Sequence, residues 1–311
     1  MKKIKALLLF SGGLDSILAA KILIEQGIDV LGLTLKSYFF GAEQAEKSAQ
    51  VIGLSLKIVD FSKEHLEVVK NPEYGYGKAI NPCIDCHLLM LKKARDIMVK
   101  QGFDFVATGE VLGERPMSQN QKAMELIERE SGLEGYLLRP LSAKLLEQTI
   151  PEKKGWVDRE KLSAIKGRSR KKQIALAKKY HIKDYPNPAG GCLLCEKNFG
   201  EKLKELLKRN TGAGGSDMEL LKIGRHFWHN HAKVVVGRSH EENLLLKKVF
   251  EKGDVLIEPD NFMGASALIR SYDVDGLEIS NDIIEQAKKT IIEYSKKAKV
   301  PESAKFKIKT K

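Results

Sequence analysis

The first part of the chain alternates between the patterns of buried strands and amphipathic helices. Ile4–Phe10 is an apolar run broken only by Lys5, typical of a strand buried in a parallel sheet, and Asp15–Gln26 repeats apolar residues at helical spacing. The alternation continues with strands over Asp29–Leu35, Leu56–Phe61 and Phe103–Thr108 and helices over Ala42–Ile52 and about His87–Lys100. This order predicts an α/β fold with a doubly wound parallel sheet, which binds ligands beyond the carboxyl ends of its strands.

The segment between the first strand and the first helix reads SGGLDS, residues 11–16. Gly12 and Gly13 allow the backbone to approach a phosphate, and the N–H groups that open the helix point at the anion. Ser11 and Ser16 add hydroxyl donors. A plain glycine turn is the alternative, but strand, glycine loop and helix coincide here. The Gly-Lys-Ser/Thr of a P-loop kinase is missing, so γ-phosphate chemistry is not indicated.

A run of glycine and small polar residues, Asn210–Asp217, indicates a linker between domains over 1–209 and 218–311. Beyond it we expect strands at Ala232–Val236, Val255–Ile257 and Ala265–Ile269 and a helix at Asp282–Lys297. These elements predict a second, smaller α+β domain. The tail over 296–311 holds seven lysines and one glutamate, and we expect it to be partly disordered.

Basic residues outnumber acidic ones by 53 − 41 = 12, which favours a polyanionic partner, either nucleic acid or an anionic membrane surface. Between Pro151 and Tyr180 there are eleven Lys or Arg and three acids, a local net charge of +8. The densest cluster comprises Arg168, Arg170, Lys171 and Lys172. A solvated helix face is the alternative, but we favour contact with RNA phosphates.

The longest early apolar run, Ala6–Phe10, is too short for a signal peptide or a membrane span, and no later run comes close. We therefore expect a cytoplasmic protein with no membrane partner.

The four cysteines form two Cys-x-x-Cys pairs, Cys83 with Cys86 and Cys192 with Cys195. A basic protein in a reducing compartment argues against a disulfide framework. Four buried small hydrophobic residues, a structural zinc site, an iron–sulfur cluster and a nucleophilic thiol with a resolving partner all remain open. The spacing alone does not choose among them.

The SGGLDS string resembles the PP-loop of ATP pyrophosphatases, the adenine nucleotide alpha-hydrolase-like enzymes that split ATP between the α and β phosphates. The resemblance implies ATP binding by Ser11, Gly12, Gly13, Asp15 and Ser16, with Mg²⁺ bridging the phosphates. Asp15 would orient the metal or the pyrophosphate. It also implies adenine against the backbone at Leu35 and a contact at Gly109.

The segments NPCIDC and GGCLLC resemble the two cysteine segments of the tRNA 2-thiouridylase family, and ATGEVLG resembles a segment of tRNA 4-thiouridine synthases. The run from LLRPLSAKLL to YPNPAGGCLL is similar to thiouridylase-like PP-loop proteins with an appended DUF814 domain. On this resemblance Cys86 and Cys192 match the catalytic cysteines. Cys83 stands where many thiouridylases have Asp.

The resemblance also bears on a metal site. Cys83, Cys86 and Cys192 could hold a [4Fe-4S] cluster with one iron open to hydrosulfide. Cys195 would then be a fourth ligand, a resolving thiol or a bystander, and a closed four-cysteine zinc site is the alternative.

Residues 221–269 resemble the NFACT-R (DUF814) RNA-binding domain, which implies that Arg225, Trp228 and Arg238 face RNA. A metal site at His226, His229 and His231 carries little weight, because alternating residues of a strand point to opposite faces.

Together these features predict a tRNA sulfurtransferase that makes thiouridine by adenylating a uridine carbonyl oxygen. Its partners would be tRNA and a sulfur donor, either sulfide or a persulfide carrier protein, and a homodimer is left open. The alternatives are an RNA-binding translation or quality-control factor that uses the PP-loop as a nucleotide sensor, and a PP-loop amidotransferase-type enzyme.

Overall fold

The computed structural model describes residues 3–186, 191–273, 279–295 and 300–311. The chain divides into two compact units, Met1–Glu196 and Lys197–Lys311, and each is described by itself. Within the described ranges, no helix is both long and apolar enough to cross a membrane.

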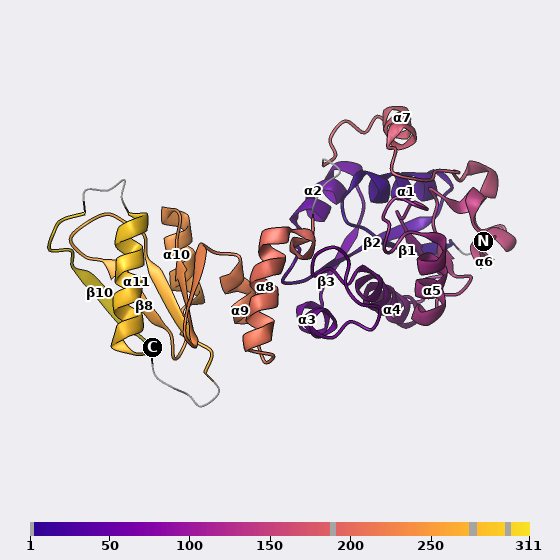
Figure 1. The fold of residues 1–311 in the computed structure, drawn as a ribbon. Coiled ribbons are helices and arrows are strands. Elements are labelled where there is room, and N and C mark those ends of the chain that lie inside the picture. The colour runs from indigo at the N-terminus through magenta and orange to yellow at the C-terminus, as the bar shows by residue number, and fades with distance from the viewer. Residues whose placement is uncertain (1–2, 187–190, 274–278, 296–299) are drawn as a thin grey trace. The chain divides into compact units, whose positions relative to one another are not determined.

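The first unit is built on a five-stranded parallel sheet with the order β3-β2-β1-β4-β5 (Figure 1). Its strands are β1 (Lys5–Leu9), β2 (Asp29–Lys36), β3 (Leu56–Asp60), β4 (Phe105–Thr108) and β5 (Leu137–Leu138). Its helices are α1 (Leu14–Glu25), α2 (Glu43–Ile52), α3 (Ser62–Lys70), α4 (Cys83–Gln101), α5 (Gln121–Ser131), α6 (Ile150–Lys153) and α7 (Lys171–Lys179), with short 3₁₀ turns at Ala143–Leu145, Arg159–Lys161 and Leu193–Cys195. The predicted doubly wound sheet is confirmed.

Alternate residues of the central strand β1 serve two separate cores. Ala6 and Leu8 pack with α1, α2 and α7 on one face of the sheet, whereas Leu7 packs with α4 and α5 on the other (Figure 1). Burial on both faces explains why this strand is apolar throughout after Lys5. After β1 the chain adds β2 and β3 on one side, and it then adds β4 and β5 on the other side. Such a switch point between β1 and β4 forms a crevice at the carboxyl edge of the sheet.

The second unit is a five-stranded antiparallel sheet with the order β10-β8-β9-β7-β6. Its elements are α8 (Lys197–Arg209), α9 (Gly215–Leu221), β6 (Arg225–His229), β7 (Ala232–Val236), α10 (His240–Val249), β8 (Val255–Pro259), β9 (Ala267–Ser271), α11 (Asn281–Tyr294) and β10 (Phe306–Thr310). α11 packs on one face of the sheet, and α9 and α10 pack on the other. The smaller α+β domain is confirmed.

The unit boundary lies before the glycine-rich run that suggested a linker at 210–217. That run contains the turn between α8 and α9 and the first residues of α9, and both helices belong to the second unit. The apolar face of α8, with Phe199, Leu203 and Leu206 buried, explains why this helix joins a core. A glycine-rich turn between helices and a domain linker share the same composition.

The expected disorder of the lysine-rich tail is wrong for its last part. Phe306–Thr310 forms β10, antiparallel to β8, while residues 296–299 lie outside the described residues. Phe306 packs edge-on against Phe262, and Lys309 pairs with Glu258 at 2.9 Å. Alternation of lysine with apolar residues therefore marks an edge strand here. The expected helix to Lys297 ends at Tyr294 among the described residues.

Candidate active site

The loop between β1 and α1 is held by its own side chains and by β2 and α2. Ser16 Oγ donates to the carbonyl of Gly13 at 2.8 Å, and Ser11 Oγ accepts from the Gly13 N–H at 3.3 Å. Thr34 of β2 donates to the carbonyl of Phe10 at 2.6 Å, and Ser48 of α2 donates to that of Gly12 at 2.9 Å. Bonds to carbonyl groups fix the loop while leaving N–H groups at the α1 N-terminus for an anion.

Two of the predicted glycines lie where no other residue fits. A Cβ on Gly12, whose φ is +74°, would lie 2.5 Å from the carbonyl oxygen of Gln44. A Cβ on Gly109, at the end of β4, would lie 2.6 Å from the backbone nitrogen of Ser16. The two glycines thus bring the ends of β1, α2 and β4 together around the loop. Leu35 lies at the end of β2, beside β1, as expected for this edge.

Asp15, in the first turn of α1, has a buried carboxylate oxygen, Oδ1, with no hydrogen-bond partner among the described residues. Burial raises the pKa of Asp15, although Arg170, the neighbouring Gln173 amide and Arg115 favour its ionised form. An unpaired carboxylate oxygen beside an N–H-rich loop matches a divalent cation that accompanies a polyphosphate. The residues present therefore fit ATP with Mg²⁺.

The first cysteine pair lies in the first turn of α4. Cys83 is half-buried and accepts from the Asn81 amide at 3.1 Å, whereas Cys86 is buried. Burial raises the pKa of the Cys86 thiol, and the nearby Cys83 and Asp85 act in the same direction. Cys86 is therefore a neutral thiol in this structure.

Sequence reasoning missed the residue that contacts Cys86. His65 of α3 is fully buried, and its Nε2 lies 2.8 Å from Cys86 Sγ. Its Nδ1 lies 2.9 Å from Ser37 Oγ, and its ring stacks on Phe61 with the centroids 4.8 Å apart. Burial lowers the pKa of His65 to about 4, so the imidazole is neutral near pH 7. The only available signal was a lone histidine in the helix after the third strand.

The second cysteine pair is attached to the same edge of the sheet through the backbone. The N–H of Leu193 donates to the carbonyl of Phe39 at 3.0 Å, and the Phe39 ring contacts His65 edge-on. Cys192 is half-buried and Cys195 is exposed. Cys195 lies close enough to Cys83 to raise the pKa of that thiol, and burial adds to the effect.

The described residues do not show the expected iron–sulfur or zinc site. Across the described ranges, no three His, Cys, Asp or Glu side chains are grouped so that they could hold a metal ion. The contact of Cys86 is with the neutral His65. All four cysteines are free. No step is therefore assigned to a cluster.

A buried network joins the Cys86 turn to the end of β4. His87 Nδ1 lies 2.9 Å from Glu110 Oε1, and Arg139 Nε lies 3.1 Å from Glu110 Oε2. Burial alone would raise the pKa of Glu110, but His87 and Arg139 outweigh it and lower the pKa to about 2. Burial likewise opposes the charged form of His87, but Glu110 raises its pKa overall. Glu110 directly follows Gly109, and His87 directly follows Cys86.

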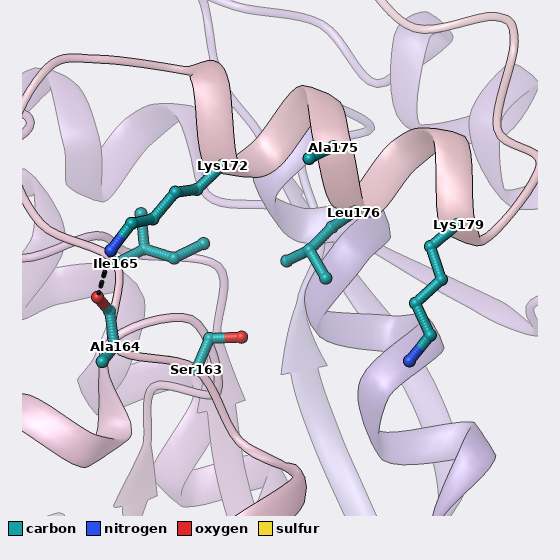
Figure 2. Close-up of a pocket in the computed structure, with 7 residues that line it drawn as sticks. All are labelled: Ser163, Ala164, Ile165, Lys172, Ala175, Leu176 and Lys179. Atoms are coloured by element: carbon teal, nitrogen blue, oxygen red, sulfur yellow. Dashed lines mark hydrogen bonds between the residues drawn. The ribbon is translucent and has the colours of Figure 1, made fainter.

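The basic run before α7 separates into two environments. Arg168, Lys171 and Lys172 are exposed, whereas Arg170 Nε is buried and Arg170 is close enough to Asp15 to favour its ionised form. A groove of about 450 Å³ lies between α7 and residues 163–165, with Lys172 bound to the carbonyl of Ala164 at 3.3 Å (Figure 2). Residues of the SGGLDS loop do not line this groove.

In the second unit, the arginines expected to face RNA have intramolecular contacts. Arg225 lies over the ring of Tyr294 at 4.6 Å, and Arg238 Nε donates to Glu242 at 2.9 Å. The Trp228 ring contacts two cations, Arg209 at 4.4 Å and the buried Lys233 at 5.0 Å from the ring centroid. His226 and His229 are three residues apart in β6 and so point to opposite faces of the sheet, and a shared metal site is not formed by these two described residues.

Comparison with known proteins gives a match in each unit. A family model described as the tRNA methyl transferase HUP domain matches residues 4–196, and one described as the NFACT protein RNA binding domain matches residues 224–311.

Among curated proteins, the chain is similar to tRNA-specific 2-thiouridylases. The Streptococcus sanguinis (strain SK36) protein is 30% identical over 277 residues, and that of Streptococcus pyogenes serotype M49 (strain NZ131) is 29% identical over 278. Each alignment covers 78% of this chain and 72% of the relative.

Among solved structures, a predicted subunit of tRNA methyltransferase from Methanocaldococcus jannaschii is 17% identical with a TM-score of 0.40, covering 68% of this chain and 90% of its own. A 4-thiouridine synthetase–RNA complex with bound ATP is 21% identical with a TM-score of 0.39, covering 70% and 52%.

Proposed function

Because the chain belongs to the tRNA methyl transferase HUP domain family and carries an NFACT RNA-binding domain, we propose that it is an ATP-dependent enzyme that thiolates a uridine of tRNA. The family resemblance seen in the cysteine segments and the SGGLDS loop is confirmed by these matches and by the 2-thiouridylase relatives. The observation that carries the proposal is that a phosphate loop and a buried, histidine-bound cysteine lie at the same carboxyl edge of one sheet.

In the first half of the proposed reaction, a uridine carbonyl oxygen attacks the α-phosphorus of ATP and pyrophosphate leaves. The N–H groups of the loop Ser11–Ser16 hold the phosphates, Leu35 and Gly109 border the nucleotide, and Asp15 holds Mg²⁺. When bound, Mg²⁺ neutralises the charge that develops on the departing pyrophosphate. The product is a uridine with AMP as its leaving group.

In the second half, sulfur replaces the activated oxygen and AMP leaves. Cys192 is more accessible than Cys86, so we assign it the incoming sulfur as a persulfide. Attack of the outer sulfur on the base carbon forms a C–S bond, and the thiol of Cys86 closes a disulfide with Cys192 as the S–S bond breaks. The disulfide accounts for the two electrons gained by the transferred sulfur, and an external thiol restores the enzyme. With sulfide as the donor, no redox change is needed.

The RNA contacts are assigned to basic residues that are exposed or, for Arg225, half-buried. Arg168, Lys171 and Lys172 would contact phosphates from the first unit, and Arg225 and Arg238 from the second. Their existing contacts with Tyr294 and Glu242 hold Arg225 and Arg238 in one orientation.

The test is an anaerobic reaction of the full chain with ATP, Mg²⁺, unmodified tRNA and a sulfur donor, followed by nucleoside mass spectrometry. Sulfide and a persulfide-loaded carrier protein are tried in parallel. Thiouridine and AMP should form together, and with the persulfide-loaded carrier Cys86→Ser should bind ATP normally while forming no thiouridine. Cys195→Ser, which changes an exposed thiol, is the matched control.

If the wild type forms neither AMP nor thiouridine, the proposal of an enzyme is rejected and an RNA-binding factor is favoured. If AMP forms without thiouridine, the adenylation step is retained, and the tested combination of sulfur donor and tRNA is rejected. Normal thiouridine from Cys86→Ser would remove that residue from the mechanism.

A further inference from the structure

Gln173, in the first turn of α7, is a buried polar residue whose amide makes no hydrogen bond of normal geometry. Its side chain is fully buried, and its amide neighbours Asp15, whose ionised form it favours. An unpaired buried amide costs about 1–3 kcal/mol, so folded proteins rarely leave one without a reason. The Leu176 and Ala177 positions that follow are apolar and pack on the core, as an ordinary helix face does.

Two further unpaired groups lie beside this amide. Arg170 Nε, just before α7, and Asp15 Oδ1, in the first turn of α1, are also buried without a hydrogen-bond partner. Arg170 and Gln173 are both close enough to Asp15 to favour its ionised form. The three unused groups therefore form one cluster beside the SGGLDS loop, and they come from two separate segments of the chain.

The chemistry of this cluster is that of a polyphosphate site. A guanidinium N–H and an amide NH₂ donate to phosphate oxygens, while a carboxylate oxygen binds the accompanying divalent cation. A nucleotide in the loop supplies all of these partners at once.

We propose that Arg170 and Gln173 bind the triphosphate of ATP, so that the start of α7 completes the nucleotide site. This inference rests on the proposed ATP site, but not on sulfur transfer or on the RNA substrate. It separates Arg170 from the exposed Arg168, Lys171 and Lys172, although all four lie in one basic run. The basic run over 168–172 and the following Gln173 would thus contact two ligands, ATP and RNA.

The test is Gln173→Leu, which has a similar size and removes the amide. Binding is measured by calorimetry with Mg²⁺ and α,β-methylene-ATP, which is not cleaved at the α–β bond, in the absence of tRNA. We expect affinity to fall about tenfold or more, because the lost contact is a hydrogen bond to a charged group. Without nucleotide, the melting temperature should rise by about 2–4 °C, because the unpaired amide is gone.

These opposite signs distinguish a ligand contact from a structural one, since a structural contact would lower both stability and affinity. Arg170→Met should weaken binding in the same way and serves if the Leu variant does not fold. Lys178→Ala, an exposed position of the same helix, is the matched control and should bind as the wild type does.

Wild-type affinity in both Gln173→Leu and Arg170→Met would overturn the inference while leaving the ATP site in place. Failure of the wild type itself to bind the nucleotide would overturn the proposed function, and this inference with it.

Discussion

A neutral imidazole has a single N–H, so His65 donates a hydrogen bond to one of its two neighbours and accepts one from the other. With its pKa lowered to about 4 by burial, the ring has one donor and one acceptor nitrogen near pH 7. If Nδ1–H donates to Ser37 Oγ, Nε2 accepts from the Cys86 thiol. The histidine is then placed to take the thiol proton when Cys86 reacts.

We therefore predict that His65→Phe, which retains the aromatic stack on Phe61, lowers thiouridine formation by about a hundredfold. Nucleotide affinity should change by less than about twofold, because no group of the phosphate loop is removed. The measurement pairs single-turnover thiouridine formation with calorimetry. His240→Phe, at an exposed histidine of the second unit, is the control. Full activity of His65→Phe would reject the role.

Individual site residues were predictable from sequence only where a local motif holds them. The phosphate loop is such a motif, because strand, glycines and helix follow one another. His65 and Cys86 are 21 residues apart and meet only in the folded chain. Gln173 lies in a basic run whose composition points to the surface, whereas the structure buries its side chain completely.

At the scale of elements, β4 and α1 approach each other so closely that only glycine fits between them. We predict that Gly109→Ala destabilises the first unit by about 1–3 kcal/mol, because a Cβ there would clash with backbone and not with a flexible side chain. Nucleotide affinity should fall as the start of α1 shifts. Denaturant unfolding and calorimetry check both effects. Gly214→Ala, which adds a Cβ into open space, is the control, and an unchanged Gly109→Ala would reject the close packing.

A buried lysine lies on β7, an inner strand of the second sheet. Lys233 of β7 is 1% exposed, and burial lowers its pKa to about 8 from an unfolded value of 10.5. Between these pH values the unfolded state holds more protons, so stability rises with pH. Below about pH 8 the full cost of burying the charge is present.

Lys233→Met should therefore stabilise the protein at pH 7 by about 2 kcal/mol, after loss of the contact with Trp228. The advantage should shrink as the pH rises from 8 to 10, because the wild-type lysine loses its charge in the folded state. Denaturant unfolding at pH 7 and at pH 10 measures the difference. Equal differences at the two pH values would contradict the prediction. Lys248→Met, on the nearby helix α10, controls for the loss of a lysine.

Elements with strong apolar periodicity were predictable from sequence, whereas elements that depend on contacts with distant segments of the chain were not. β7 is buried along its length and β1 over Ala6–Leu8, and the ranges of both agree with the expected strands within a residue or two. β10 was missed because its lysines suggested a solvated tail, although they pair with Glu258 and Asp260 in the sheet. The turn before α9 has the composition of a domain linker, and composition does not distinguish a turn between helices from a linker.

At the scale of the whole molecule, the net charge of +12 predicts binding to tRNA that depends strongly on salt. Affinity should fall by about a hundredfold or more between 50 and 200 mM monovalent salt, because each phosphate contact releases bound counterions. Lys171→Ala should reduce the slope of log affinity against log salt by about one. Lys122→Ala, which removes one exposed charge from α5, is the control. Equal slopes for the two variants would reject the basic run as an RNA contact.

Gly109 touches the phosphate loop and Cys86 carries the reactive thiol, yet only one ion pair separates them. Glu110 is covalently next to the first, His87 is next to the second, and the two side chains are bonded to each other. These contacts connect the end of β4 with the turn that holds the Cys86 thiol. Such a linkage would delay sulfur transfer until the base has been activated, so that the sulfur donor is not consumed without product.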